Sequence, residues 1–401
     1  MPWHQHLIFF STTRMHLPFK VFDRMSICLT GPQPSSKSSK PEMNNSRTNA
    51  FDAFRAKRRF HGLDGIRCVS IVAVMYFHYT FADPRLGKLG VDLFFIISGF
   101  LITTLLLRER DKTGRIGLRN FWMRRILRIF PIYYGFIFIQ LVIFQLIPMK
   151  PEMVKDFYYN LPAFLTFTNN WFVHLQIDRS VIFYHAWSLA AEEQFYLLWP
   201  PILIYLTSVP KMLIIIAILI IIDVTLTNLV RVEIVNLGEN GNSIITSLQT
   251  AICIGVIAAI VLHHQRTFDL VIRFLNWYWT TSLAVGTAVT LIIFDAPDVV
   301  VYLVLAVFLM SSAVTTSHAL APLINSFPLG FVGRVSYGMY IMHMAAINAV
   351  RLVVFPERAP TDELVVTVGF LFTIAAAAGS FYLYERPILA LRSRFRPKYR
   401  D

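Results

Sequence analysis

Charged residues are scarce in this chain of 401 residues: they make up 15% of it, against about 25% in soluble proteins. Hydrophobic residues make up 55%, and the mean hydropathy is +0.55. So little charge excludes an ordinary soluble domain. The apolar runs approach the roughly 20 residues that a membrane-spanning helix needs, and short alternating strands of a membrane barrel are not seen. We therefore predict an all-α, polytopic transmembrane helix bundle.

Cysteine is also rare. The three cysteines, Cys28, Cys68 and Cys253, are odd in number and far apart. This spacing argues against a disulfide framework and against a zinc site, and we expect no metal. An internal repeat, which many transporters carry, is not visible either.

Ten apolar segments follow one another along the chain. Their approximate bounds are 64–82, 90–107, 129–148, 189–207, 210–230, 245–264, 278–294, 299–316, 331–351 and 364–384. The stretches after the second and sixth segments are basic, as is the C-terminal tail, so the positive-inside rule places both termini in the cytoplasm. The net charge of +13 thus reflects topology, and we expect no nucleic-acid partner.

The first part of the chain differs in composition from the rest. Residues 1–60 are rich in Ser, Pro and Lys, which predicts a disordered basic cytoplasmic tail. We assign 61–390 to a transmembrane domain and 391–401 to a second basic cytoplasmic tail. Met25 and Met43 remain alternative starts. Neither a signal peptide nor an organelle-type targeting segment is recognisable, which fits a bacterial inner (plasma) membrane.

The first apolar segment opens with Arg67 and carries His78 near its end. Eleven helical steps make about three full turns plus 20°, so both side chains share one face, roughly 16 Å apart along the axis. Arg67 alone is explained as an anchor at the membrane surface, and His78 as a hydrogen-bonded core histidine. Alternatively, a neutral imidazole held in a dry site is suited to act as a general base.

Three arginines crowd the start of the third segment. Arg128 is four residues after Arg124 and three after Arg125, so all three are expected to gather on one side of a helix end. Anchoring at the inner surface, or binding of anionic lipid head groups, explains such a cluster. A phosphate clamp explains it too, because guanidinium groups match phosphate oxygens in pairs. Arg67 is predicted at the same mouth.

The fourth segment begins with Trp187-Ser188 and the adjacent carboxylates Glu192 and Glu193. An acidic helix start complements the helix dipole. Neighbouring residues point about 100° apart, so at most one of the two carboxylates is expected to face a central cavity. Trp187 and Tyr196 are suited to stack on a sugar, or to join an aromatic belt.

Two further stretches carry polar residues in apolar surroundings. Asp92, in GVDLFFIISGFLI, is placed to cap the start of the second span, and Ser98-Gly99 to let another helix approach. A polar stripe in the ninth segment favours a lined cavity over a single interhelical hydrogen bond. It comprises Ser336, Tyr337, Tyr340 and His343.

These stretches occur in a characteristic order. RCVSIVAVMYFH, GVDLFFIISGFLI, RRILRIFP, WSLAAEEQFYLLWP, SYGMYIMH and the closing ERP together resemble the acyltransferase 3 family of integral membrane acyltransferases, over about residues 60–390. The resemblance implies a bundle of about ten helices. It also implies transfer of an acyl group, usually acetyl, from cytoplasmic acyl-CoA to a hydroxyl of a carbohydrate or related acceptor. An extracytoplasmic hydrolase-like domain, carried by some members, is not expected in this chain.

The resemblance also implies roles for the residues described above. We expect catalysis by His78, Glu192 and Glu193, and binding of acyl-CoA by Arg67, Arg124, Arg125 and Arg128. The expected substrate-binding residues are Asp92, Trp187, Ser188, Tyr196, Ser336, Tyr337, Tyr340 and His343. His78 would deprotonate the acceptor hydroxyl or carry the acyl group as an acyl-imidazole.

Two other functions fit a polytopic chain with polar residues at mid-membrane. One is a transporter or flippase for a lipid-linked glycan, and the other is a scaffold or sensor without catalysis. The acceptor, the length of the acyl chain and the oligomeric state are left open by the sequence.

Overall fold

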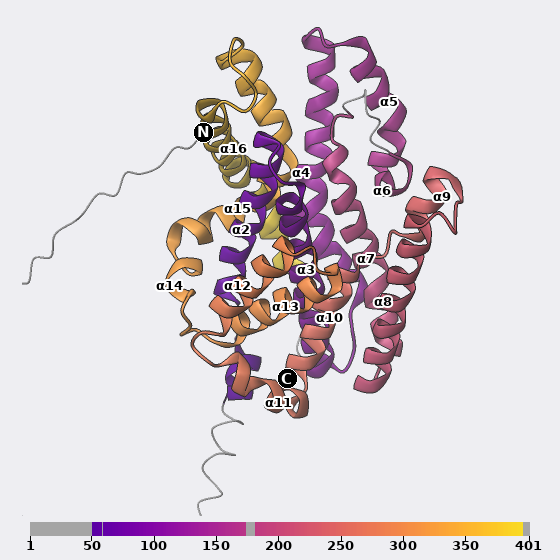
Figure 1. Ribbon diagram of the computed structural model, residues 1–401, viewed down its shortest axis with the longest axis vertical. Helices are drawn as coiled ribbons and strands as arrows, with labels where there is room; N and C mark the ends of the chain where they lie inside the picture. The colour runs from indigo at the N-terminus through magenta and orange to yellow at the C-terminus, as the bar shows by residue number, and fades with distance from the viewer. Residues whose placement is uncertain (1–49, 58, 174–180, 396–401) are drawn as a thin grey trace, which may run out of the picture. The chain divides into compact units, whose positions relative to one another are not determined.

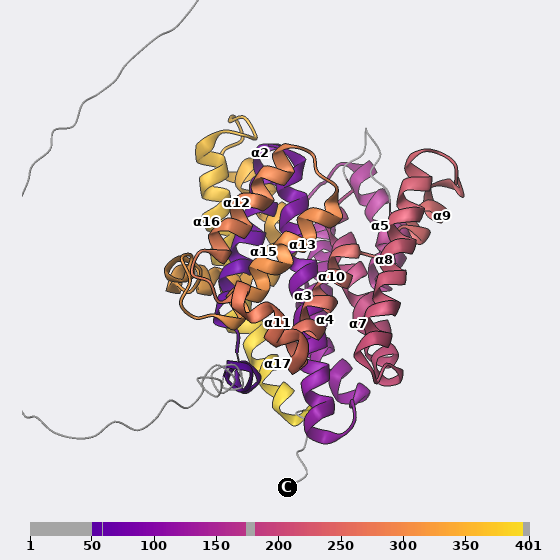
Figure 2. The same ribbon diagram turned by 60° about the horizontal axis from the view of Figure 1, so that its bottom comes forward.

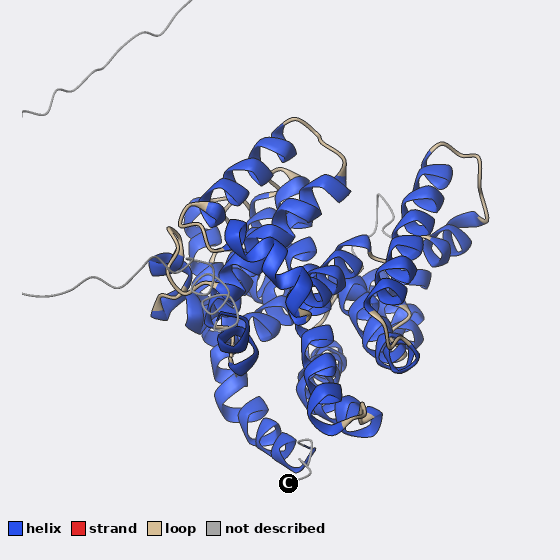
Figure 3. Ribbon diagram, turned by 90° about the horizontal axis from the view of Figure 1, so that it is seen from below, coloured by secondary structure: helices blue, strands red, loops and turns tan. Residues whose placement is uncertain are grey.

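The computed structural model describes residues 50–57, 59–173 and 181–395, and these ranges contain helices, turns and loops but no strand (Figure 3). The all-α prediction is therefore confirmed. The longer helices are α2 (His61–Thr80), α3 (Pro84–Thr113), α4 (Leu118–Leu146), α5 (Pro151–Leu165), α7 (Trp187–Tyr205), α8 (Val209–Arg231), α10 (Thr250–His263), α11 (Gln265–Leu275), α12 (Thr280–Ile293), α13 (Asp298–Val314), α15 (Phe327–Ala349) and α16 (Glu363–Ser380). The short ones are α6 (Asn169–Phe172), α9 (Gly238–Ile245), α14 (Ala321–Ile324) and α17 (Arg386–Ala390).

Four irregular helical segments complete the described chain. Two are 3₁₀ turns, Tyr184–Ala186 and Leu391–Phe395. The other two are π-helical segments, Val350–Val354 at the end of α15 and Phe381–Glu385 at the end of α16.

Six helices of the described chain are long and apolar enough to cross a membrane. They are Pro84–Thr113, Leu118–Leu146, Val209–Arg231, Gly238–His263, Phe327–Val354 and Glu363–Phe395, and two shorter apolar helices span Thr280–Ile293 and Asp298–Val314. The chain is thus built of membrane-type helices. The count of ten spans stays a prediction, because α2 and α7, which carry the charged residues of interest, are not among these membrane-type helices. The side of the termini also stays a prediction.

One predicted boundary is wrong. The basic stretch after the second segment is not a long loop, because α3 continues to Thr113 and α4 already begins at Leu118. Polar residues that extend a helix beyond its apolar part look like a loop in a hydropathy pattern. The predicted tail 1–60 lies largely outside the described residues. Its described end includes a helical segment, 50–56, whose Phe51 and Phe54 are buried against Phe268 of α11.

Helix α2 lies at the centre of the packing within residues 45–401. It contacts α3, α13, α14, α15 and α16 (Figure 1). Helices α8 and α9 lie to one side in both Figure 1 and Figure 2; α8 contacts α10, and α9 contacts α6 and α8. A central α2 places Arg67 and His78 between several helices.

Glycines allow the closest of these helix crossings. A Cβ atom on Gly99 of α3 would collide with the carbonyl oxygen of Ile252, and one on Gly255 of α10 with the carbonyl oxygen of Ile96. Gly333 of α15 meets the backbone of Asp64 in α2 in the same way. Small residues let membrane helices approach backbone to backbone, where dispersion contacts and weak hydrogen bonds hold them.

This packing gives a matched pair of substitutions. Gly255→Ala should destabilise the fold by roughly 1–3 kcal/mol, because its methyl group would push α10 away from α3. Gly286→Ala in α12 has open space around the new methyl group, so it should be neutral or slightly stabilising. Thermal unfolding of the detergent-solubilised protein, followed by tryptophan fluorescence, measures both. Equal midpoints for the two variants would contradict the close α3–α10 contact.

Candidate active site

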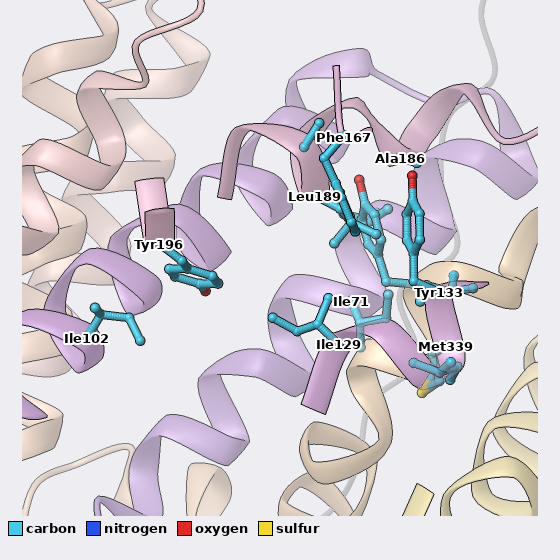
Figure 4. Close-up of a cluster of buried hydrophobic side chains, with 14 of the residues drawn as sticks. Ile71, Ile102, Ile129, Tyr133, Phe167, Ala186, Leu189, Tyr196 and Met339 are labelled. Carbon is cyan, nitrogen blue, oxygen red and sulfur yellow. The ribbon is translucent and has the colours of Figure 1, made fainter. Parts of the chain in front are cut away.

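A small cavity of about 70 Å³ lies among α2, α3, α4, α7 and α15. Of the residues predicted from the sequence, those that line it are Arg67, Arg125, Arg128, Ser188, Glu192, Tyr196, Ser336, Tyr337 and Tyr340. Apolar side chains complete the wall. Figure 4 shows Ile102, Ile129, Leu189 and Tyr196 of this wall, with Ile71 and Met339 of the same hydrophobic cluster. The volume holds a few water molecules or a group of similar size.

Three guanidinium groups meet in this cavity. Arg125 is 7% exposed, and its guanidinium lies 5.6 Å from the ring centre of Phe121 and 5.7 Å from that of Tyr196. Its Nε is buried without a hydrogen-bond partner in the described part of the chain. Arg67 reaches Asp64 only at 3.8 Å. Buried cations are costly unless they are paired, so the cavity favours an anionic ligand.

Among the described residues, Glu192 is the single carboxylate on the cavity wall, and it belongs to a hydrogen-bonded chain. Ser98 of α3 donates to the Glu192 carboxylate, and the Tyr196 hydroxyl donates to Ser98 Oγ at 3.0 Å. Sequence reasoning missed Ser98 as a site residue and assigned it to helix packing. Its signal was a lone hydroxyl in an apolar run, but its partners lie on α7, far along the chain.

The two adjacent glutamates point in different directions, as helix geometry predicts. Glu192 lines the cavity, whereas Glu193 lies outside its wall. Glu193 is within electrostatic range of Tyr133 and Tyr337. The expectation that only one carboxylate faces the cavity is confirmed.

Three histidines form a second cluster. The His78 and His343 rings are 5.0 Å apart between centroids, and those of His185 and His343 are 4.6 Å apart. His78 comes from α2, His343 from α15 and His185 from the 3₁₀ turn before α7. His185 was not predicted as a site residue, because a histidine in a connecting segment has no helical pattern that aims it.

The backbone carbonyl groups around this cluster show which ring nitrogens carry a proton. A carbonyl oxygen only accepts hydrogen bonds, so the nitrogen that faces it must be the donor. His78 Nδ1 lies 2.9 Å from the carbonyl oxygen of Val74, so Nδ1 carries the proton. His343 Nδ1 donates in the same way to the carbonyl oxygen of Tyr340 at 2.7 Å. His343 Nε2 then has a lone pair and lies 3.3 Å from His78 Nδ1, where it accepts the weaker branch of a bifurcated hydrogen bond, because the single Nδ1 proton also goes to Val74. The lone pair of a neutral His78 is therefore on Nε2.

Tyr340 connects the two groups of residues. It lines the cavity, and its ring centre is 5.7 Å from that of His343. Its hydroxyl donates to the carbonyl oxygen of His185 at 2.9 Å, and Ser188 Oγ lies 2.6 Å from the same hydroxyl. The cavity and the histidine cluster thus share one tyrosine, while Ile71 separates Arg67 from His78 along α2.

Asp92 lies away from this site, and its predicted capping role is wrong. The N-cap of α3 is Asp83, whose side chain accepts from the backbone N–H of Arg85 at 2.9 Å. Asp92 lies more than two turns further on and accepts from Lys88 Nζ at 3.0 Å. It lines a separate polar cavity of about 280 Å³ between α3 and the start of α13.

Arg124 and Trp187 are likewise not brought to the cavity wall. Arg124 points to the other side of α4, where it pairs with Glu109 at 3.0 Å and donates to the carbonyl oxygen of Phe395 at 2.6 Å. Trp187 packs against Phe95, with ring centres 6.1 Å apart. Of the predicted arginine cluster, therefore, only Arg125 and Arg128 join Arg67.

The fold and this site define a helical membrane protein with a buried, positively charged internal cavity. A family model described as an acyltransferase domain matches residues 60–385. The chain belongs to this family, acyltransferase 3.

The chain is similar to curated proteins of Staphylococcus aureus. It is 30% identical over 354 residues to the O-acetyltransferase OatA of strain NCTC 8325, a match that covers 82% of this chain and 57% of OatA. It is 28% identical over 365 residues to SACOL0978 of strain COL, which carries a provisional O-acetyltransferase name; that match covers 85% of this chain and 59% of the relative. The chain thus spans less than two thirds of these relatives. No solved structure matches it.

The hydrogen-bonded chain on the cavity wall gives a stability prediction. Ser98→Ala leaves the buried Glu192 carboxylate and the Tyr196 hydroxyl without their shared partner, so it should destabilise the protein by roughly 1–3 kcal/mol. Thr104→Val on the same helix is the control, because Thr104 Oγ1 is buried without a partner in the described residues. That change should be neutral or stabilising. Thermal unfolding in detergent measures the midpoint of both variants. A midpoint of Thr104→Val below that of Ser98→Ala would contradict the assignment of Ser98 as the shared hydrogen-bond partner of Glu192 and Tyr196.

Proposed function

We propose that this protein is a membrane O-acyltransferase that moves an acyl group, usually acetyl, from acyl-CoA to a hydroxyl of a carbohydrate or glycolipid acceptor. The observation that carries the proposal is the cavity with three arginines and one glutamate, joined through Tyr340 to a cluster of three histidines. Family membership and the O-acetyltransferase names of the relatives support the reaction type.

The arginines suit the donor. Coenzyme A carries phosphates, and guanidinium groups bind phosphate oxygens in pairs. The cavity is far smaller than a whole coenzyme A, so it would hold the thioester end while the nucleotide stays at its mouth. Arg67, Arg125 and Arg128 would then face the donor, and they would also attract electron density at the thioester carbonyl as negative charge develops there.

His78 suits the proton transfer. In the proposed step the acceptor hydroxyl gives its proton to His78 Nε2, and its oxygen attacks the thioester carbonyl carbon. The C–S bond then breaks, the acyl group stays on the acceptor oxygen, and the departing sulfur takes the proton from His78. His343 accepts from His78 Nδ1 and would hold the ring in this tautomer. The alternative is a two-step route in which His78 Nε2 carries the acyl group briefly.

The carboxylates suit different roles from those expected. Glu192 and Glu193 were both expected to act in catalysis, but of the two only Glu192 lines the cavity. We therefore assign Glu192 to the substrate side, oriented by Ser98 and Tyr196, and Glu193 to support of the surrounding tyrosines. Ser188, Ser336, Tyr337 and Tyr340 supply hydroxyl groups to the same space.

We further propose ten spans with both termini in the cytoplasm of a bacterial cell. Basic residues after the second and sixth segments support this orientation. It puts the arginine end of α2 on the side where acyl-CoA is made, and His78 toward the opposite side.

Substitution of His78 tests the catalytic step. His78→Ala should lower acyl transfer from radiolabelled acetyl-CoA to membrane glycans by about 10²–10⁴-fold, the usual contribution of a general base. Binding of acetyl-CoA should persist, since the arginines remain. Near wild-type transfer by a folded variant would overturn the role, and ion-coupled glycan uptake without any acyl transfer would favour the transporter.

Substitution of the arginines tests donor binding. Arg125→Gln and Arg128→Gln should each raise the KM for acetyl-CoA about tenfold, the loss expected for one charge-assisted hydrogen bond of roughly 1.5 kcal/mol. Arg119→Gln is a control for loss of charge, because Arg119 is exposed on the same helix and away from the cavity. Unchanged donor affinity in the two cavity variants would assign these arginines to membrane anchoring instead.

A further inference from the structure

An apolar groove of about 440 Å³ lies on a different part of the molecule, between α12 and α13. Leu283 and Ala284 of α12 line it on one side, and Val304 and Val307 of α13 on the other. Arg273 and Trp277, at the end of α11, also line it. None of these residues belongs to the cavity that holds Arg67 and Glu192.

Helix α11 is amphipathic in an unusual way. Phe268, Ile272 and Leu275 bury one face against the bundle. The opposite face is mixed: Leu270 and Phe274 are each 73% exposed, beside the exposed Arg266 and Arg273. Large apolar side chains exposed to this extent indicate contact with the hydrocarbon edge of a membrane rather than with water.

Aromatic and basic residues mark the level of this helix in the membrane. Trp277, Tyr278 and Trp279 follow α11 and are 54%, 48% and 53% exposed. Tryptophan and tyrosine gather where head groups meet acyl chains. Arg266 and Arg273 are exposed on the same helix. Figure 1 and Figure 2 both show α11 at one end of the α12–α13 pair, and α11 contacts α13.

The charge at this end of the groove is not paired with a carboxylate in the part of the chain that the structure describes. No ion pair or hydrogen bond of the Arg273 side chain is present among the described residues, and the groove lining contains no carboxylate. The lining combines one guanidinium group with an apolar trough about two helical turns long, roughly 10 Å at 1.5 Å per residue. A phospholipid has this shape and charge: a phosphate with an acyl chain beneath it.

We propose that the groove between α12 and α13 is a binding site for one anionic phospholipid, with its phosphate on Arg273 and one acyl chain along the groove. The guanidinium fork matches two phosphate oxygens, and a net negative head group leaves Arg273 neutralised. Trp277 lies beside the glycerol region. A zwitterionic lipid offers the same chain but places a positive group near Arg273, so the site discriminates by charge.

Native mass spectrometry of the full chain tests this proposal. The protein, purified in a mild detergent, is mixed with equal amounts of phosphatidylglycerol and phosphatidylcholine, and the lipid retained per chain is counted. We expect retention of one phosphatidylglycerol over phosphatidylcholine. Arg273→Gln should weaken that retention about fivefold, the effect of one arginine near an anionic head group. Arg115→Gln, an exposed arginine in the α3–α4 loop, is the matched control and should retain the lipid.

A second variant tests the groove itself and keeps the proposal testable if Arg273→Gln does not fold. Val307 is 36% exposed, so Val307→Trp fills the trough without entering the core, and it should lower lipid retention while Arg273 remains. Equal retention of the two lipids, or wild-type retention in both variants, overturns the proposal. A lipid-free dimer that Val307→Trp disrupts would assign the groove to a second copy of the chain instead.

Discussion

The gathering of three guanidinium groups, one of them buried and two half-buried, beside a single carboxylate is the constraint on which the rest of the site depends. Arg67, Arg125 and Arg128 come from two helices, and Glu192 is the only carboxylate that the described part of the chain places on the cavity wall. Aromatic faces offset part of the cost, since the Arg125 guanidinium lies over Phe121 and Tyr196. The remaining positive charge favours binding of an anion in the cavity. The helices around the cavity must also be held in place, so that the cavity does not collapse. The glycine crossings of α2 with α15 and of α3 with α10 provide that rigidity, because the backbones are in contact there.

Much of this site follows from helical periodicity. The stripe in α2, the pair Ser188 and Glu192 of α7 and the polar residues of α15 could be predicted from the sequence because helical spacing brings each set to one side of its helix. What joins the sets could not be predicted in the same way. Ser98 meets Glu192 and Tyr196 only because α3 crosses α7, and His185 reaches His343 from a 3₁₀ turn. Packing between distant segments decides such contacts, and no local pattern encodes them.

The errors have a physical origin as well. Polar residues at membrane surfaces extend helices past their apolar parts, so α3 and α4 run through a stretch that hydropathy assigns to a loop. Adjacent helical residues point about 100° apart, so Arg124 pairs with Glu109 while Arg125 faces the cavity. Asp92 was placed at a helix start because the apolar run begins beside it, but the helix begins earlier, at Pro84, after the cap Asp83. For the predicted loop and for Asp92, the helix was longer than its hydrophobic part.

The histidine cluster explains why one imidazole rather than another would act as the base. All three histidines contact backbone carbonyl oxygens: His78 that of Val74, His343 that of Tyr340 and His185 that of Ile341. Each contact fixes a proton on one nitrogen and leaves a lone pair on the other. The lone pair of His343 is used by His78 Nδ1, whereas that of His78 is on Nε2, on the far side of its ring. His78 is also less deeply buried than the other two histidines: His343 is 0% exposed and His185 is 6% exposed, whereas His78 is half-buried. In the proposed mechanism, therefore, the hydrogen bond from His78 Nδ1 to the carbonyl oxygen of Val74 leaves Nε2 as the nitrogen that receives the proton. The contact with His343 opposes a flip of the His78 ring.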